Sequence, residues 1–387
     1  MSVSPTLTRR QINRATLARQ MLLSREKVST LDAVERLAGL QAQLARPPFL
    51  GLWSRVRDFQ REDLSKLLLS RKVVRGTLMR GTLHLASARD YRAQRAVFQE
   101  LFTQSAKSIL RERAENLDVP ALVAEARAFF DEQPRPFEAL RDFLVARHPK
   151  FDERAMGFTV RMSLPVLQVP TEDDAWAFPG TTDFAVAETW LGAPLSTDVS
   201  PRELVLRYLA AFGPASVTDA QEWSGLSRLK DTFESLRPQL VTFRDERGRE
   251  LFDLPKAPRP SEDVEAPVRF LPDFDNLILG HDDRTRVVAD AHRKLISKAN
   301  LRILPTFLVD GFAAGTWSCE LKRSVAALEL EPFGALTKPV RTALTEEGEA
   351  LLRFMEPEAR DFEVRVAGEA AKPARAAART RARPPRR

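Results

Sequence analysis

The sequence predicts an α+β protein with three tandem winged-helix domains followed by a small β-barrel-like C-terminal domain. Before Pro267, groups of three amphipathic helix patterns and a two-strand pattern recur, which is the element order of a winged helix. After Pro267 the pattern becomes strand-like. The length of 387 residues also suits several domains. We therefore predict domains at 1–90, 91–191, 192–256 and 262–366, and a separate tail at 367–387.

The first domain begins with a helix signature. Thr8 and Gln11 have the spacing of a capping box, and Ser29 is placed to cap a second helix. Leu31, Val34, Leu37 and Ala38 would share one face of that second helix. The expected elements are helices over 12–22, 31–38 and 64–68, then strands over 73–78 and 82–85 around Arg80-Gly81.

The third domain has the clearest pattern. A capping box with proline at the first helical position starts at Ser200, and Gly213-Pro214 stops that helix. Ser216 and Ser227 then open two further helices, ahead of strands over 240–244 and 250–254. The middle domain is less regular, with helices expected over 119–130 and 136–147 and a wing formed by 158–169 with 174–178.

The C-terminal domain is predicted from strand patterns. Strands are expected over 268–271, 303–309, 313–317 and 325–330, followed by a helix over 339–354. Asp310-Gly311 is a strong two-residue hairpin turn between two of them. The tail has only alanine as an apolar residue, so we expect it to be disordered.

The positive charge is concentrated at the two ends of the chain. The net charge is +7. The segment 368–387 has seven Lys or Arg and one acidic residue, and the segment 1–90 has 17 Lys or Arg and seven acidic residues. Basic modules on an otherwise acidic body indicate a polyanion-binding protein such as a DNA-binding protein. The alternative is a composition bias towards arginine without any such partner.

Several classes of protein are not supported by the sequence. The chain has no apolar stretch long enough for a membrane span and no secretory signal pattern. Its one cysteine and four scattered histidines favour neither a disulfide nor a zinc site. Neither a Walker loop nor a glycine-rich dinucleotide motif is visible. We expect no cofactor, no metal and a cytoplasmic, nucleoid-associated location.

A pair of glutamines is the main candidate for chemistry. Gln41 continues the apolar stripe of the second predicted helix, so its amide must be paired internally or open onto a cleft. Arg46-Pro47-Pro48 favours a helix end nearby, and in extended chain Gln41 and Gln43 would face the same side. The two amides could then meet at one pocket. The alternative interpretation is a capping or buried structural glutamine.

The combination of motifs resembles the winged-helix DNA glycosylases of the AlkZ type. The resemblance covers roughly residues 5–363 and rests on these blocks: Gly39-Leu40-Gln41-Ala42-Gln43, Leu50 to Arg55, Arg75 to Leu85, Phe270 to Asp275, Asp283-Arg284, Val309-Asp310-Gly311 and Gly315-Thr316-Trp317. The family's catalytic motif is Gln-x-Gln, or Gln-x-Asp in a sister subfamily, which Gln41 and Gln43 match in the first form. The middle position is usually larger and more apolar than Ala42.

The resemblance implies a monofunctional glycosylase that excises cationic N-alkylated purines, including bulky adducts or interstrand crosslinks. Such a purine is already a good leaving group. Two neutral amides then suffice for catalysis, because they only need to position a water and stabilise an oxocarbenium-like sugar. Uncharged lesions such as uracil would be poor substrates. We expect the partner to be duplex DNA with alkylated bases, bound by a monomer. The predicted DNA contacts are Arg46, Arg55, Arg75, Arg80 and His84.

The sequence leaves the role of a carboxylate cluster and the choice between enzyme and regulator open. The carboxylates Asp273, Asp275, Asp282 and Asp283 could suggest acid–base or metal chemistry, but we favour turn structure, since acids near DNA repel phosphate. A DNA-binding regulator without catalysis and a catalytically silent relative are the alternatives to an enzyme. Regulators of this type are usually dimers, whereas three winged helices in one chain favour a monomer.

Overall fold

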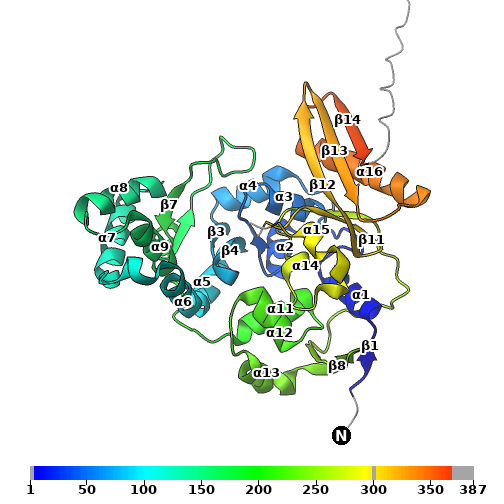
Figure 1. Cartoon of the computed structure of the whole chain (residues 1–387), viewed down its shortest axis with the longest axis horizontal. Helices are drawn as coiled ribbons and strands as arrows, with labels where there is room; N and C mark the ends of the chain where they lie inside the picture. The colour runs from blue at the N-terminus through cyan, green and yellow to red at the C-terminus, as the bar shows by residue number, and fades with distance from the viewer. Residues whose placement is uncertain (1–3, 299–301, 368–387) are drawn as a thin grey trace, which may run out of the picture. The chain divides into compact units, whose positions relative to one another are not determined.

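The computed structural model describes residues 4–298 and 302–367, so the expected disordered tail lies outside the described residues. The chain is a mixed α+β protein that divides into two compact units, Met1–Ala314 and Gly315–Arg387 (Figure 1). Among the described residues, no helix is long and apolar enough to cross a membrane.

The first predicted group of elements is present. Thr8 and Gln11 form the capping box, and the Ser29 side chain accepts from the backbone N–H of Asp32. The elements are β1 (Thr6–Leu7), α1 (Arg9–Arg19), α2 (Thr30–Arg36), β2 (Leu40–Gln41), α3 (Pro47–Trp53), α4 (Arg61–Leu69), β3 (Val73–Thr77) and β4 (Leu83–Ser87). The patterns did not predict α3, which begins at two prolines in a short segment without helical periodicity.

The middle group contains the two expected helices, but its wing differs from the prediction. The elements are α5 (Ala88–Gln94), α6 (Gln99–Leu110), α7 (Val119–Glu132), β5 (Arg135–Pro136), α8 (Phe137–Arg147), α9 (Glu153–Ser163), β6 (Val166–Gln168), β7 (Asp183–Val186) and α10 (Ala187–Leu191). The predicted strand over 158–169 was wrong in its first half, because Asp152 caps a helix that continues to Ser163. The second strand of the hairpin is β7, not 174–178.

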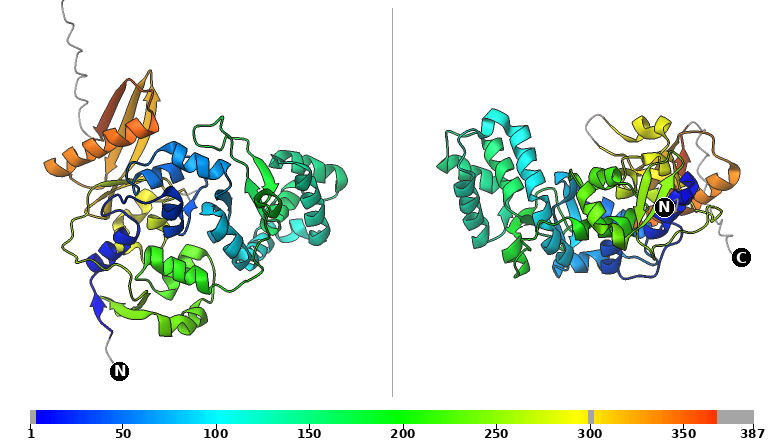
Figure 2. Two further views of the ribbon diagram at one scale, coloured as in Figure 1. Left: turned by 180° about the vertical axis from the view of Figure 1, so that it is seen from behind. Right: turned by 90° about the horizontal axis from the view of Figure 1, so that it is seen from below.

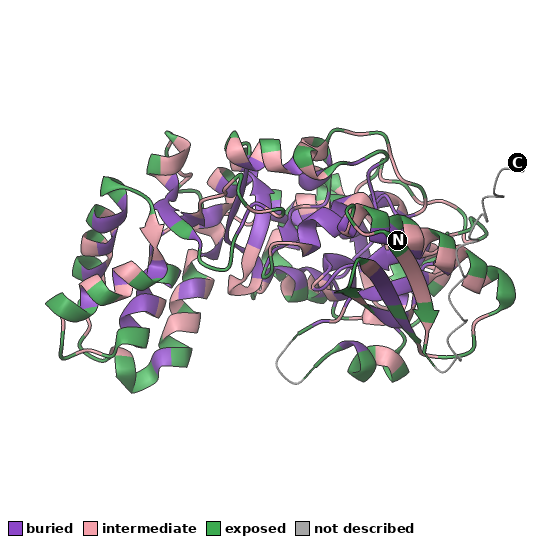
Figure 3. Ribbon diagram, turned by 90° about the horizontal axis from the view of Figure 1, so that it is seen from above, coloured by how far each residue is buried: buried purple, intermediate pink, exposed green. Residues whose placement is uncertain are grey.

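Helices α7, α8 and α9 pack on β6 and β7 around their own core. Phe130, Phe137, Leu140, Val160 and Phe184 are among its buried members. Figure 3 shows the helices of this part with buried and exposed residues alternating along their turns, as amphipathic helices do.

The first two groups share one six-stranded sheet, with strand order β2-β4-β3-β6-β7-β5. Strands β3 and β6 are antiparallel, with Gly76 opposite Leu167. A Cβ atom at Gly76 would lie 2.7 Å from Tyr91 and 2.8 Å from Leu167, so only glycine fits here. The sheet therefore continues across residue 90, where we placed a domain boundary.

The third group has the predicted helices and hairpin, but the predicted caps Ser200 and Ser227 were wrong, because Pro201 and Leu229 hold the N-cap positions without a side-chain hydrogen bond. It contains α11 (Arg202–Phe212), α12 (Val217–Ser224), α13 (Lys230–Leu236), β8 (Val241–Asp245) and β9 (Glu250–Asp253). Strand β1 pairs with β8 in parallel, which joins the N-terminal residues to this hairpin. Tyr208, Phe212 and Trp223 belong to a large core that also contains Phe98 and Phe102 from the region around α6.

The rest of the chain is rich in strands, as expected. The first unit ends with β10 (Arg269–Leu271), α14 (Asn276–Leu279), α15 (Arg293–Ile296) and β11 (Thr306–Val309), and β12 (Phe312–Lys322) runs into the second unit. The second unit adds β13 (Val325–Pro332), α16 (Lys338–Met355) and β14 (Asp361–Val366). Helix α16 packs on β13 and β14 (Figure 2). A closed barrel and the winged-helix layout stay predictions.

Candidate active site

Gln41 lies on a strand and not on a helix. The second helix ends at Arg36, and Ala38 and Gly39 then adopt positive φ angles of 53° and 87°. The prediction that the helix continues through Ala38 to Gln41 was therefore wrong, and the alternative of an extended chain is confirmed. Gln41 lies opposite His84 in the β2–β4 ladder. At Gly39 a Cβ atom would lie 3.0 Å from the Leu85 carbonyl oxygen, so glycine is needed at this turn.

Ala42 lies between the two glutamines, and both its backbone N–H and its backbone carbonyl are hydrogen-bonded. The Ala42 N–H donates to the Leu83 carbonyl at 2.7 Å. The Ala42 carbonyl accepts two hydrogen bonds from Arg75, from Nε at 2.9 Å and from Nη2 at 2.7 Å. Ala42 is fully buried. The backbone of the Gln-Ala-Gln segment is therefore fixed by β4 and by a buried arginine from β3.

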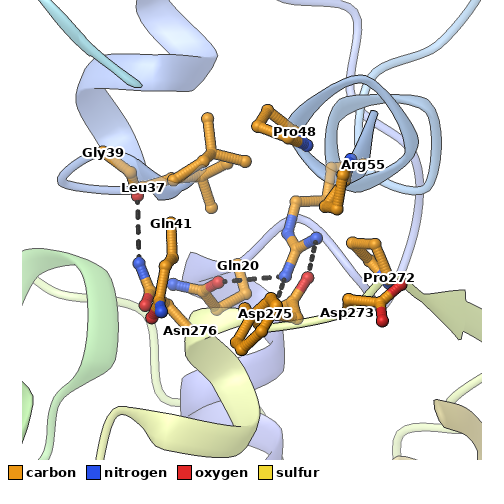
Figure 4. Close-up of a pocket in the computed structure, with 13 residues that line it drawn as sticks. Gln20, Leu37, Gly39, Gln41, Pro48, Arg55, Pro272, Asp273, Asp275 and Asn276 are labelled. Carbon is orange, nitrogen blue, oxygen red and sulfur yellow. Dashed lines mark hydrogen bonds and ion pairs between the residues drawn. The ribbon is translucent and has the colours of Figure 1, made fainter. Parts of the chain in front are cut away.

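The side chain of Gln41 is held by a network of polar groups. Its Oε1 accepts a hydrogen bond from Arg80 Nη2 at 2.7 Å, and the same nitrogen lies 3.1 Å from Asn276 Oδ1. Asn276 Nδ2 in turn donates to the Gly39 carbonyl at 3.3 Å. Figure 4 shows Gln41 and Asn276 close together, with the Asn276 amide directed towards Gly39. Gln41 is 7% exposed, so this pairing satisfies the carbonyl oxygen of a nearly buried amide.

Gln43 has a different environment. It is exposed, and its Oε1 accepts from the Leu83 N–H at 2.9 Å. Gln41 lines a pocket, whereas Gln43 is not among that pocket's lining residues, so the two amides do not meet at one pocket as the sequence suggested. Both glutamines therefore turn a carbonyl oxygen towards the β3–β4 hairpin. Among the described residues, neither side-chain NH₂ group donates to an acceptor.

The pocket beside Gln41 is small. Its lining residues come from the end of α1, the segments around α2 and α3, and the turn before α14: Gln20, Leu37, Gly39, Leu40, Gln41, Pro47, Pro48, Arg55, Pro272, Asp273, Phe274, Asp275 and Asn276. Its volume of about 20 Å³ has room for one water molecule, and its accessible lining is mostly apolar. The pocket is too small for a purine.

A buried ion pair forms one wall of this pocket. Arg55 donates from Nη1 and Nη2 to the two carboxylate oxygens of Asp275, at 2.9 and 2.8 Å. The side chains are only 2% and 4% exposed. Arg55 Nη2 also lies 3.3 Å from Gln20 Oε1 (Figure 4). Asp275 also caps α14, because its Oδ1 accepts from the Leu277 N–H, and so it positions Asn276.

Most of the predicted DNA contacts are directed into the protein. Arg55 is 1% exposed, Arg75 5% and His84 0%. Burial lowers the pKa of Arg75 to about 10, and its guanidinium lies 4.8 Å from the centre of the Phe178 ring. These three side chains cannot reach a phosphate without leaving their partners. We therefore correct their assignment from DNA contacts to residues that hold the site in place.

His84 is neutral at physiological pH. Burial, with the nearby charge of Arg80, lowers its pKa to about 3. Its Nδ1 lies 3.0 Å from the Thr82 carbonyl, which can only accept, so the proton is on Nδ1. The buried Nε2 atom has no hydrogen-bond partner in the part of the chain that the structure describes. Of the five predicted DNA contacts, only Arg46 is partly exposed with no side-chain hydrogen bond or ion pair to another described residue.

Three of the four carboxylates have the structural roles that we favoured, and Asp282 is exposed. Asp275 and Asp283 cap short helical turns, and Asp273 binds Arg302 through one oxygen at 2.7 Å. No group of three or more potential metal ligands occurs within residues 4–298 and 302–367.

Gln20 and Asn276 line the pocket but were not predicted from the sequence as site residues. Asn276 directly follows the Phe270 to Asp275 block, which was the one available signal for it.

Comparison with known proteins identifies relatives of the chain. A family model described as "DNA glycosylase AlkZ-like" matches residues 34–354. A Streptomyces sahachiroi protein named "Interstrand DNA cross-link repair glycosylase" is 26% identical over 328 residues, which cover 80% of this chain and 87% of the relative. The solved structure of Streptomyces sahachiroi DNA glycosylase AlkZ has a TM-score of 0.75 at 23% identity and covers 93% of this chain and 100% of that chain. This last likeness shows a common fold.

Proposed function

Because the chain belongs to the AlkZ-like DNA glycosylase family, we propose that it hydrolyses the N-glycosidic bond of cationic N-alkylated purines in duplex DNA, with Gln41 and Gln43 as its catalytic residues. The observation that carries this proposal is the Gln41 amide, held by Arg80 beside a pocket of about 20 Å³ that has room for one water. The reaction needs one water and a lesion that already carries positive charge.

The chemistry suits neutral amides. A purine alkylated at N7 or N3 is a good leaving group, so little acid catalysis is needed. Glutamine cannot act as a strong base, but the Gln41 carbonyl oxygen has a second lone pair besides the one that Arg80 occupies. That lone pair can accept a hydrogen bond from a water and direct its oxygen towards the sugar. The amide dipoles would stabilise the positive charge that develops on the sugar.

The small size of the pocket supports the proposal that bulky lesions are substrates. Glycosylases that enclose a base need a cavity of matching size. The pocket beside Gln41 is far smaller than a purine, so on this proposal the base stays outside it and only the water enters. The size of the alkyl group would then matter little. For this reason we extend the proposal to bulky adducts and to interstrand crosslinks, the lesion named for the Streptomyces sahachiroi relative.

The proposal includes an arrangement for DNA binding. We propose that the three groups of helices with their hairpins are winged helices, that the strands after Pro267 belong to a barrel-like domain, and that the enzyme acts as a monomer on DNA in the nucleoid. The exposed basic residues within residues 1–90 would bind the phosphate backbone. Arg46 follows the Gln-Ala-Gln segment closely and is its nearest candidate for such a contact.

The test is a direct assay for abasic sites. Purified protein is incubated with a duplex that contains one N7-methylguanine, and strand breaks at abasic sites are then revealed by alkali. We expect breaks at the lesion only, and none in the matched guanine duplex or in a duplex with uracil. As a protein control, Gln104→Ala removes an exposed glutamine on α6 and should keep full activity. Binding without any excision would indicate the regulator or the catalytically silent relative instead.

A further inference from the structure

Arg80 lies in a hairpin turn, yet its side chain is directed into the protein and not towards solvent. It lies at the turn between β3 and β4 with a φ angle of 56° and a ψ angle of 13°. The backbone at this turn is packed against the end of α12, where a Cβ atom on Gly225 would lie 2.9 Å from Arg80 Cα. The turn is therefore fixed from outside, and the side chain extends inwards towards the glutamine.

The guanidinium group connects three segments that are distant in sequence. It donates to Gln41 Oε1, to Asn276 Oδ1 and, from Nη1, to the carbonyl of Trp223 at the end of α12. All three acceptors are neutral, and Arg80 forms no ion pair with a described carboxylate. Burial lowers its pKa to about 10, so it is still charged at neutral pH.

Arg80 is partly exposed, but its guanidinium is desolvated, and such a cation without a carboxylate partner costs stability. Neutral side chains could connect the same segments at lower cost, so stability alone does not account for an arginine here. A neutral amide side chain in this place could flip and accept as well as donate, whereas a guanidinium only donates and therefore fixes the orientation of the Gln41 amide. A free glutamine amide rotates broadly about its last torsion angle. Beside Arg80, the flipped amide would bring its NH₂ group against the donor Nη2.

We propose that Arg80 is a positioning residue that fixes the orientation of the Gln41 amide for catalysis, and that it is not a DNA contact. The inference rests on the proposed function. The carbonyl oxygen is held inwards with one lone pair left, and the NH₂ group is directed away from the cation. The rate of bond hydrolysis should then depend on Arg80 through Gln41, whereas DNA affinity should not.

The first experiment is a double-mutant cycle under single-turnover conditions on the N7-methylguanine duplex. Arg80→Lys keeps the charge but loses the fork, and it should slow excision about 10- to 100-fold, which is the range expected for one hydrogen bond to a charged group. The dissociation constant should stay within about twofold of wild type. In a Gln41→Ala background, Arg80→Lys should change the rate by less than about threefold, because the group through which it acts is gone.

The chain provides a matched control. Arg71 also has a positive φ angle, of 60°, and also donates to a tryptophan carbonyl, that of Trp190 at 2.8 Å. It contacts neither glutamine and is exposed. Arg71→Lys should leave the excision rate at the wild-type value. A loss of DNA affinity in Arg80→Lys, with effects on the rate that multiply with those of Gln41→Ala, would make Arg80 a phosphate contact and overturn the proposal.

A second measurement does not depend on activity. In protein labelled with ¹⁵N at glutamine, the side-chain NH₂ signals of Gln41 are assigned by their loss in Gln41→Ala. We expect Arg80→Lys to shift these signals and Arg71→Lys to leave them unchanged. Unshifted signals in Arg80→Lys would contradict the positioning role. Shifted signals in a protein that excises nothing would keep the contact but refute the proposed function, so the two failures are distinguishable.

Discussion

Replacement of Arg55 by methionine should destabilise the protein without weakening its binding to DNA. The substitution keeps an apolar stem but removes both hydrogen bonds to Asp275, at 2.9 and 2.8 Å, and leaves a carboxylate that is 4% exposed without its cation. Each bond to a charged group contributes about 1.5–3 kcal/mol, and breaking a buried pair from one side typically costs about 3–5 kcal/mol. We expect a loss of about 3–5 kcal/mol in the free energy of unfolding.

Urea denaturation followed by tryptophan fluorescence measures this loss. Asp275→Asn in the Arg55→Met background removes the uncompensated charge and keeps an oxygen for the Leu277 N–H, so it should restore most of the stability. Arg57→Met removes an exposed arginine two residues away and serves as the control. If Arg55→Met unfolds like wild type but binds duplex DNA more weakly, the sequence-based assignment of Arg55 as a DNA contact was correct and our correction was wrong.

Three further predictions concern the basic tail, two buried histidines and the second glutamine of the motif. Deletion of residues 368–387, which have a net charge of +6, should flatten the dependence of DNA affinity on salt, because each lost phosphate contact changes the log–log slope by about 0.9; an unchanged slope would exclude the tail as a DNA-binding arm. Burial lowers the pKa of His84 and of His281 to about 3, so below pH 6.5 the unfolded chain binds more protons than the folded one. Stability should therefore fall as the pH decreases from 6.5 towards 3, by up to about 1.4 kcal/mol per pH unit for each histidine, and denaturation at pH 7.5 and 5.5 measures this. Gln43→Asp keeps an oxygen for the Leu83 N–H and should retain excision within about tenfold of wild type, whereas complete inactivity would show that the second amide is essential.

The sequence predicted the order of elements well where local signals were strong. The capping residues Thr8, Ser29 and Ser216 all start helices as expected. The failures arose where tertiary structure decides. The periodicity of Leu31, Val34 and Leu37 did not reveal the end of α2, because positive φ angles at Ala38 and Gly39 take the chain out of the helix. Pairing of β3 with β6 across the first expected boundary is a contact that no local pattern indicates.

The site was predicted in part. The glutamine motif was found from the sequence, but the hydrogen-bond network around Gln41 was not, because Arg80 is 39 residues from Gln41 and Asn276 is 196 residues from Arg80. Arginines in a basic segment are naturally interpreted as phosphate contacts. Only the structure reveals that Arg55 and Arg75 are directed inwards to Asp275 and to the Ala42 carbonyl. Charge predicts a partner for a whole segment, whereas the direction of each side chain depends on the fold around it.

The most direct test of the account measures excision and binding together for Gln41→Ala and Gln43→Ala. Loss of one well-placed polar group at a reacting centre typically costs about 10²–10³ in rate. We predict a loss of this size for Gln41→Ala on the N7-methylguanine duplex, a clear loss for Gln43→Ala, and affinities for the same duplex near wild type, because an interaction made only in the transition state does not contribute to binding. Circular dichroism and urea denaturation confirm that each variant is folded. If both variants fold, bind and excise like wild type, the glutamines are structural and the proposed mechanism is contradicted.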